Sequence, residues 1–486
     1  MRRFQLAAFL IPACLFRLIS LQAASPSEAI RQDSDPLRWT LSTANSSYQV
    51  FLAPDSNLAP GWFGPLSNGR LFEAAPGASW IPPKKIGTSI REIPYRGGFQ
   101  AMEPALEVVF GDNVRELELV YAGQETGQLD GYPYIRFDLR DTYYPLRVSE
   151  YIRLIPELDI YEKWLVLENT GQKNILVEQA LSGSTVLPAG QYELTQLSGE
   201  WGREFFPRTS LLTPGVKSLS IKALKSQPGP PFYMLRPAGE RDEFHGPVWF
   251  GEVAWTGNWR IDCAVNPGEA AQVAGGINWW NTHWNLKPGT KFETPKLIFG
   301  FTQEGPSGAS RSLHRYLLEH VLPADAASQP AKVLYNSWYA TGFNVNSSQQ
   351  IALAKVAAEV GVELFVMDDG WFRGRVGDES GLGDWTPDPV KFPQRLKPLI
   401  EAVNKLGMDF GLWVEPEMVN PVSDLYRAHP DWALHTPHRT AHLGRDQLVL
   451  NLAREEVKQY LLDVLDKLLT ENNIRFIKWD MNRYVS

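Results

Sequence analysis

Polar and aromatic residues gather at four places in the last third of the sequence, each directly after a short apolar run. The four groups are Asn336 with Trp338, Asp368 with Asp369, 413–417, and 478–482. Carboxylates beside tryptophan, with asparagine and lysine nearby, suit cleavage of a glycosidic bond. One carboxylate attacks or stabilises an oxocarbenium-like carbon, donors hold the hydroxyl groups, and an aromatic wall covers the sugar face. A single Asp after a strand usually caps a helix or turns a loop, whereas four coincident groups indicate a site.

Other chemistries lack their sequence signatures. The sequence has no glycine-rich loop followed by Lys-Ser or Lys-Thr, and 374–377 fits no nucleotide fingerprint, so phosphate chemistry is not indicated. His435, His438 and His442 share one loop, but loop histidines at irregular spacing are more often solvated than bound to a metal. We therefore expect no metal and no cofactor.

Short apolar runs alternate with amphipathic segments after residue 332, which predicts parallel β-strands connected by helices. The expected strands are 333–335, 364–367, 410–414 and 474–479, and the expected helices are 351–360, 396–406 and 457–468. A (β/α)8 barrel is the commonest fold of this kind, and its strand ends open on one face, where active sites lie. Four strands make the first half of a barrel, so we expect a chain truncated within the catalytic barrel. A smaller, self-sufficient α/β domain is the alternative.

Period-two alternation dominates the sequence before this region, as in 115–119, and turn residues separate the alternating runs. This pattern predicts an antiparallel β-sandwich domain over 32–300. A short helix at 311–321 then lies in a linker over 301–331, and the partial catalytic domain follows over 332–486. The predicted fold class is multidomain, β plus α/β.

The N-terminus carries two arginines, an apolar run over 6–16 and small residues before position 25, which is typical of an export signal. We expect 1–24 to be a signal peptide and the protein to be periplasmic or extracellular, with a frayed terminus or a misplaced start as the alternative. Its removal takes away Cys14 and leaves Cys263, so no internal disulfide can form. A formal net charge of −8 at pH 7 argues against nucleic-acid partners, and no later apolar run is long enough to span a membrane. The sequence leaves open whether the chain forms a homo-oligomer.

Over 332–483 the sequence resembles glycoside hydrolase family 36, the melibiase type of α-galactosidase. The motifs that carry the resemblance are Asn336-Ser337-Trp338, Asp368-Asp369-Gly370-Trp371-Phe372, Leu382-Gly383-Asp384-Trp385, Trp413-Val414-Glu415-Pro416-Glu417-Met418, Gly444-Arg445 and Lys478-Trp479-Asp480-Met481-Asn482. The preceding β domain is similar to the N-terminal supersandwich of this family in order and character.

The resemblance implies a retaining mechanism on terminal α-D-galactosyl residues of galacto-oligosaccharides, galactolipids or other galactosides, with Asp480 as the nucleophile. It also implies that seven residues hold the galactosyl unit at subsite −1: Trp338, Asp368, Asp369, Trp413, Arg445, Lys478 and Asn482.

The charged residues each have a chemical reason and a simpler alternative. Asp368 and Asp369 suit hydrogen bonds from two sugar hydroxyls, or they cap a helix. Lys478 lies on the same strand face as Asp480, so its cation can keep that carboxylate ionised; otherwise it is a surface lysine. Arg445 offers a planar set of donors to hydroxyl groups, or it pairs with a neighbouring acid.

The aromatic residues are equally ambiguous. Trp338 and Trp413 suit either stacking on a sugar or packing in a core, and only their strand-end positions favour stacking. The family usually has Glu after the first-strand tryptophan, where this sequence has Tyr339. This departure leaves open how that strand is supported by hydrogen bonds.

A retaining glycosidase needs a second carboxyl group roughly 5 to 5.5 Å from the nucleophile to protonate the leaving oxygen. The family takes this acid from a later barrel strand, and the nearby substitutes, Glu415 and Glu417, belong to a motif that the family keeps for structural support. The chain as given is therefore expected to lack efficient hydrolysis. The alternatives to α-galactosidase are an α-N-acetylgalactosaminidase, a raffinose-family α-galactosyl transferase, or a noncatalytic galactose-binding remnant.

Overall fold

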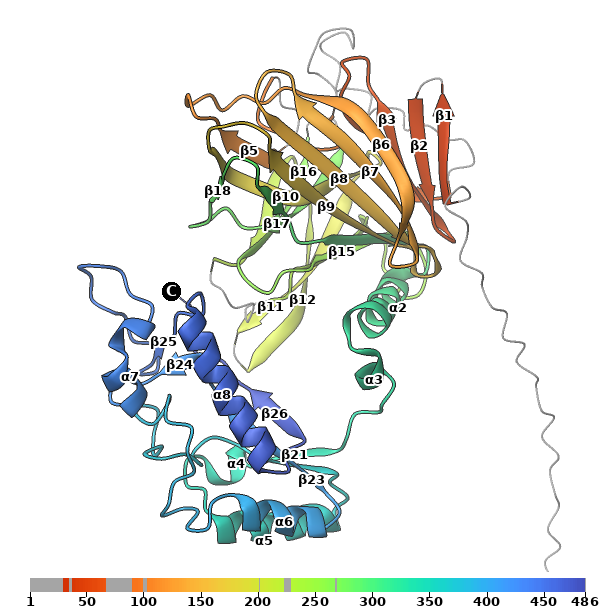
Figure 1. Cartoon of the computed structure of the whole chain (residues 1–486). Coiled ribbons are helices and arrows are strands. Elements are labelled where there is room, and N and C mark those ends of the chain that lie inside the picture. Colours follow the sequence, from red (N-terminus) through yellow and green to blue (C-terminus); the bar gives the residue numbers. More distant parts are fainter. Residues whose placement is uncertain are drawn as a thin grey trace, which may run out of the picture. The chain divides into compact units, whose positions relative to one another are not determined.

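The structure is a computed structural model that describes residues 29–34, 37–66, 90–98, 103–200, 202–222, 229–266 and 269–485. The expected signal peptide, 1–24, lies outside these residues. The chain divides into two compact units, the first ending at Tyr316 and the second beginning at Leu317 (Figure 1). Each unit has its own buried core.

Antiparallel strands build the first unit, which confirms the prediction from period-two alternation. The strands are β1 (Ile30–Ser34), β2 (Leu37–Ser42), β3 (Ser46–Leu52), β4 (Leu58–Pro65), β5 (Leu106–Val109), β6 (Leu119–Leu129), β7 (Tyr132–Asp141), β8 (Leu146–Ile155), β9 (Ile160–Asn169), β10 (Ile175–Leu187), β11 (Tyr192–Glu200), β12 (Arg203–Leu211), β13 (Gly215–Ser220), β14 (Phe232–Pro237), β15 (Val248–Val253), β16 (Trp259–Val265), β17 (Ala271–Ile277), β18 (Trp284–Leu286), β19 (Lys291–Glu293) and β20 (Leu297–Thr302).

These strands form three sheets. Their orders are β1-β2-β3-β4, β13-β16-β17-β10-β18 with β5 paired to β10, and β12-β11-β14-β15-β20-β9-β8-β7-β6 with β19 paired to β9. β10 contacts both β9 and β4, so the sheets pack on one another around a shared apolar core.

Two elements of the first unit differ from their predicted bounds. The expected strand 115–119 lies outside the sheet until β6 begins, because the Leu117 amide donates to the Arg96 carbonyl oxygen at 2.9 Å instead of to a neighbouring strand. The expected helix 311–321 begins earlier, as α2 (Gly305–Tyr316), and continues as a π-helical turn over Leu317–Val321. One face of α2 packs against the β core, so this helix is part of the first unit.

A buried charge cluster links the sheets of the first unit. Lys163 of β9 is fully buried, and its Nζ donates to a Glu92 carboxylate oxygen, to the Tyr48 hydroxyl at 2.8 Å and to the Ser184 carbonyl at 2.8 Å. A Glu150 carboxylate oxygen lies 3.5 Å from the same nitrogen. One ammonium group faces two buried carboxylates, and burial raises the pKa of Glu150 to about 8.

Glu150→Gln is expected to flatten the pH dependence of stability. The pKa of Glu150 rises on folding from 4.5 to about 8, so the folded state binds more protons between these values. The free energy of unfolding therefore falls as pH rises, by up to about 1.4 kcal/mol per pH unit. Urea unfolding at pH 5 and pH 8 measures this slope, with the exposed Glu157→Gln as control. A slope that Glu150→Gln leaves unchanged would contradict the assignment.

Four parallel strands form the sheet of the second unit, as the sequence predicts. They are β21 (Leu334–Asn336), β22 (Leu364–Met367), β23 (Asp409–Val414) and β26 (Phe476–Trp479), paired in this order. The other elements are α3 (Ala324–Ala327), α4 (Trp338–Thr341), α5 (Ser347–Glu359), α6 (Lys397–Lys405), α7 (Asp424–Ala428), the 3-10 turn Pro430–Trp432, α8 (Glu455–Glu471) and a small antiparallel pair, β24 (Met418–Val419) with β25 (Leu448–Val449). The predicted β plus α/β fold class is confirmed.

Local sequence explains these elements. Asn346 caps α5, because its side chain accepts a hydrogen bond from the Gln349 amide at 2.9 Å. The apolar face of α6 buries Leu399, Ile400 and Val403 in the core that also holds the strand residues. Among the described helices, none has the length and apolar content that crossing a membrane requires.

Candidate active site

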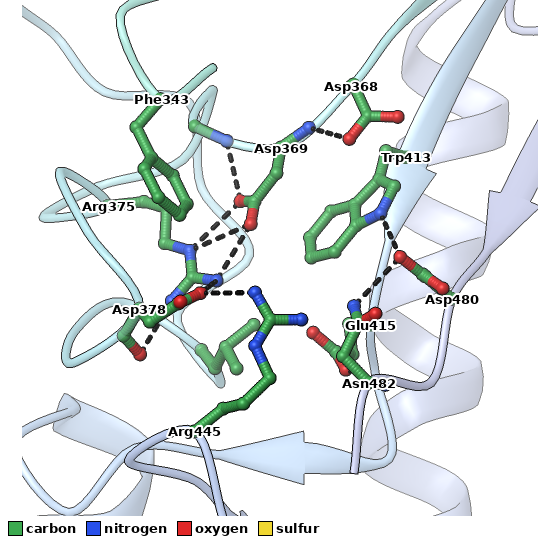
Figure 2. Close-up of polar contacts among 12 residues, drawn as sticks. Phe343, Asp368, Asp369, Arg375, Asp378, Trp413, Glu415, Arg445, Asp480 and Asn482 are labelled. Atoms are coloured by element: carbon green, nitrogen blue, oxygen red, sulfur yellow. Dashed lines mark hydrogen bonds and ion pairs between the residues drawn. The ribbon is translucent and has the colours of Figure 1, made fainter. Parts of the chain in front are cut away.

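The carboxyl ends of the four parallel strands bring the predicted residues together. Asn336 ends β21, Asp368 follows β22, and Asp480 follows β26. Hydrogen bonds then join side chains from different strands: Asn336 Nδ2 to Asp368 Oδ2 at 2.5 Å, and Trp413 Nε1 of β23 to Asp480 Oδ2 at 2.9 Å. Figure 2 shows Asp368, Trp413 and Asp480 close to one another. The convergence expected from the strand ends is present in the structure.

Asp480 is held by donors from its own loop and from the neighbouring strand. Its Oδ2 accepts from Trp413 Nε1 at 2.9 Å and from Asn482 Nδ2 at 2.8 Å, and its Oδ1 accepts from the Met481 amide at 3.0 Å. Burial favours the neutral acid, but these hydrogen bonds and the nearby Lys478 cation outweigh it and lower the pKa of Asp480 below its usual value. The carboxylate is therefore ionised at neutral pH.

Asp368 is almost fully buried and accepts hydrogen bonds from three donors. Its Oδ1 accepts from the Asp369 amide at 2.8 Å, and its Oδ2 accepts from Asn336 and, at 2.7 Å, from Lys478 Nζ. Lys478 therefore acts on two carboxylates, whereas the sequence predicted an effect on Asp480 alone. Lys478 forms its ion pair with Asp368, while its charge also helps to lower the pKa of Asp480.

Asp369 depends on a residue that sequence reasoning missed. Arg375 is fully buried and forms a double contact with the carboxylate, from Nε to Oδ1 at 2.9 Å and from Nη2 to Oδ2 at 2.7 Å. Burial raises the pKa of Asp369, and the Arg375 charge opposes this rise. The sequence does not distinguish the buried Arg375 from its exposed neighbour Arg373, because both lie in an irregular loop without periodicity.

Arg445 forms an ion pair with a neighbouring acid, which is the alternative role that the sequence allows. Its Nη2 lies 2.7 Å from Asp378 Oδ1, and Arg375 Nη2 lies 3.6 Å from the same oxygen. Asp378, also missed from sequence, therefore links the two arginines. Figure 2 shows the Arg445 guanidinium between Asp378 and Glu415. A role of Arg445 on the sugar stays a prediction.

The two tryptophans differ in their surroundings. Trp413 is 1% exposed and packs parallel to Phe372, with ring centroids 6.2 Å apart, so it offers Asp480 its indole N–H and has no open face for stacking. The core-aromatic alternative therefore fits Trp413. Trp338 is half-buried at the start of α4 and meets the edge of Phe343, with ring centroids 5.1 Å apart.

The two glutamates that follow β23, Glu415 and Glu417, hold the loops around Asp480. Glu415 is fully buried and accepts from the Asn482 amide and, at 3.4 Å, from Gln447 Nε2. Glu417 accepts from Trp479 Nε1 at 2.9 Å. Burial raises the pKa of Glu415. These contacts agree with the supporting role that the resemblance implies for both residues.

Two further sequence observations concern Tyr339 and the histidine loop. Tyr339 stands where the family usually has Glu; it is 94% exposed, and no described side chain hydrogen-bonds to it. His435 Nδ1 lies 3.1 Å from the carbonyl oxygen of Ala433 in its own loop. Within the described parts of the chain, no three His, Cys, Asp or Glu side chains are arranged to hold a metal.

An ionised carboxylate, two buried aspartates with fixed orientations and a lysine thus lie at the carboxyl edge of a parallel sheet, the edge where folds of this kind carry their active sites. Comparison with known proteins gives the family. The family model for the glycosyl hydrolase family 36 N-terminal domain matches residues 62–287, and the Melibiase model matches residues 291–486. The chain belongs to glycoside hydrolase family 36.

Similar proteins agree with this assignment. Alpha-galactosidase AgaA of Geobacillus stearothermophilus is 34% identical over 82% of this chain and 57% of its own length, and alpha-galactosidase 2 of Hypocrea jecorina is 30% identical over 96% and 65%. Among solved structures, the α-galactosidase of Lactobacillus brevis is 31% identical with a TM-score of 0.88, over 94% of this chain and 65% of that chain. The chain thus spans about three fifths of the length of these curated relatives.

Arg375→Met is expected to destabilise the second unit strongly, because it leaves the buried Asp369 carboxylate without its cation. Removing one partner of a buried ion pair typically costs about 3–5 kcal/mol. Urea unfolding followed by tryptophan fluorescence measures this loss. Arg373→Met, two residues away and exposed, is the matched control and should change stability by less than about 0.5 kcal/mol. Equal effects of the two substitutions would show that the buried pair does not stabilise this loop.

Proposed function

We propose that this chain supplies the nucleophile and the galactose-binding side chains of a retaining α-galactosidase. The observation that carries the proposal is the Asp480 carboxylate, which is ionised and oriented by Trp413 and Asn482 beside two buried aspartates. Family membership supports the substrate class. Solved structures of variants of the Geobacillus stearothermophilus enzyme AgaA contain raffinose or stachyose.

In the proposed reaction, the Asp480 carboxylate attacks the anomeric carbon of a terminal α-galactosyl unit while the bond to the leaving oxygen breaks. A galactosyl ester of Asp480 forms, and water then cleaves this ester with net retention. Asp368 and Asp369 accept hydrogen bonds from sugar hydroxyls, and Lys478 balances the charge beside them. Trp338, Arg445 and Asn482 complete the proposed binding set, and Trp413 orients the nucleophile.

The leaving oxygen requires a proton, and we assign this role to neither Glu415 nor Glu417. Glu415 is fully buried and already accepts hydrogen bonds from Asn482 and Gln447, while Glu417 accepts one from Trp479. A substrate whose leaving group needs no proton therefore tests the nucleophile by itself.

Incubation with α-galactosyl fluoride is expected to release fluoride and attach one galactosyl unit to Asp480, because fluoride departs without protonation. Intact mass and peptide mapping locate the label. Asp480→Asn should lower labelling to background, whereas Asp463→Asn, an exposed aspartate of α8, should label like the native chain. Labelling that survives in Asp480→Asn, or no labelling of the native chain, refutes the assignment.

Trp413→Phe is expected to move the acid limb of the labelling rate to higher pH by about one unit. The substitution removes one hydrogen bond to a charged group, worth about 1.5 kcal/mol, so the pKa of Asp480 rises and its ionised fraction at low pH falls. The measurement is the labelling rate from pH 3 to 7. Trp432→Phe, a buried tryptophan of a separate cluster, is the control. An unshifted profile would mean that Trp413 does not set the pKa of the nucleophile.

A further inference from the structure

A second concave site lies on the β-sheets of the first unit. A cleft of about 500 Å³ opens among β5, β10, β16 and the loop between β17 and β18. This volume lies in the range of roughly 300–1,000 Å³ found for small-molecule sites. No part of the proposed active-site chemistry uses these residues, so the cleft needs an explanation of its own.

An exposed tryptophan forms one wall of the cleft. Trp279 is 44% exposed, although an aromatic ring of this size is normally mostly buried. Arg260 covers part of the ring, with its guanidinium carbon 5.7 Å from the ring centroid. Trp280 meets the same ring in a T-shaped contact, with ring centroids 5.9 Å apart. The part of the Trp279 ring that neither residue covers lies beside the cleft and offers apolar surface.

The loop that carries Trp279 is fixed by hydrogen bonds. The Asn258 side chain is buried, and its Nδ2 donates to the Asn278 carbonyl at 3.2 Å and to Thr282 Oγ1 at 2.7 Å. The Thr282 amide donates to the Trp279 carbonyl at 3.1 Å, which closes the turn. The exposed ring is thus held in place before any ligand arrives, which lowers the entropic cost of binding.

Polar groups surround this ring. Asp262 pairs with Arg260 at 2.7 Å, and Glu107 and Glu178 lie on the strands across the cleft. Within the described residues, the Glu107 side chain has no hydrogen bond or ion pair. Carboxylates accept paired hydrogen bonds from neighbouring hydroxyl groups, and Arg260 supplies donors.

The charge of the cleft narrows the ligand class. Four carboxylates, from Glu103, Glu107, Glu178 and Asp262, line the cleft with one guanidinium, from Arg260. Arg115, which is not among the lining residues, pairs with Glu178, so the acids still exceed the cations and an anion would be repelled. The described residues place no three of the acids close enough to hold a metal. An apolar ring face beside hydroxyl-binding carboxylates instead matches a neutral sugar, which has C–H faces and vicinal hydroxyl groups.

We propose that this cleft is a second saccharide-binding site, which binds a neutral stretch of a glycan chain through stacking on Trp279 and hydrogen bonds to Glu107. The proposal rests on the proposed function to the extent that an α-galactoside substrate places such glycans at the protein. The site would hold a polymeric galactoside on the protein independently of the candidate active site.

Affinity gel electrophoresis in galactomannan, a mannan chain with α-galactosyl branches, tests the site on the whole chain. The native chain should migrate more slowly with polymer than without it. Trp279→Ala should weaken the apparent affinity about tenfold or more, and Glu107→Gln should weaken it in the same direction. Trp284→Ala, which removes a tryptophan that is 51% exposed but does not line the cleft, should migrate like the native chain.

Arg445→Ala, which removes an exposed side chain of the proposed galactose-binding set, separates this site from the proposed function. Retardation of Arg445→Ala equal to that of the native chain supports the cleft, whether or not Asp480 is labelled by α-galactosyl fluoride. Loss of retardation in Arg445→Ala would place the binding in the second unit and overturn the proposal. Full retardation of both Trp279→Ala and Glu107→Gln would also overturn the proposal. A change of oligomeric state in Trp279→Ala, measured by light scattering, would overturn it as well, because it would identify this surface as a protein interface.

Discussion

Buried carboxylates at one edge of a parallel sheet impose the main constraint on the second unit. Asp368, Asp369 and Glu415 are at most 4% exposed, and Asp480 is partly buried beside them. Such groups repel one another and lose hydration, so each needs a cation or an N–H donor at hydrogen-bond distance. Much of the surrounding structure meets this requirement, and the same contacts orient the side chains that we propose bind the sugar.

The buried Arg375 and the half-buried Lys391 connect the loops that follow β22. Arg375 binds Asp369 and also donates to the carbonyl oxygens of Asp378 and Ser380. Lys391 Nζ donates to the Gly370 and Arg375 carbonyls, each at 2.7 Å. These loop carbonyl groups have no partner in a sheet, and the charged side chains supply their hydrogen bonds. The geometry around Asp369 therefore depends on this network rather than on regular secondary structure.

The sequence predicts the elements well where a repeating pattern exists. The strand 364–367 matches β22 residue for residue, and 410–414 lies within β23, because continuous apolar runs mark buried parallel strands. The convergence of Asp368 and Asp480 follows from this topology. The prediction of a strand over 115–119 is wrong for the residues before β6. Alternation alone does not reveal that the Leu117 amide donates its hydrogen bond to a loop carbonyl.

Partners that come from loops could not be predicted in the same way. Arg375 and Asp378 carry no periodic signal, and their roles depend on a loop that folds back on itself. The sequence also left open which face of Trp413 is covered. Packing against Phe372 determines this, and the position of Phe372 depends on the turn after Asp369. Tertiary contacts thus decide the finer chemistry, while local pattern decides where the site lies.

A crystal structure of this chain with galactose bound tests the central claim most directly. The account predicts one galactose at the strand ends, with its anomeric carbon facing the Asp480 carboxylate and its hydroxyl groups on Asp368 and Asp369. The account would be contradicted by galactose bound there with its anomeric carbon turned away from Asp480. It would also be contradicted if no galactose bound at the strand ends at a saturating concentration of the sugar.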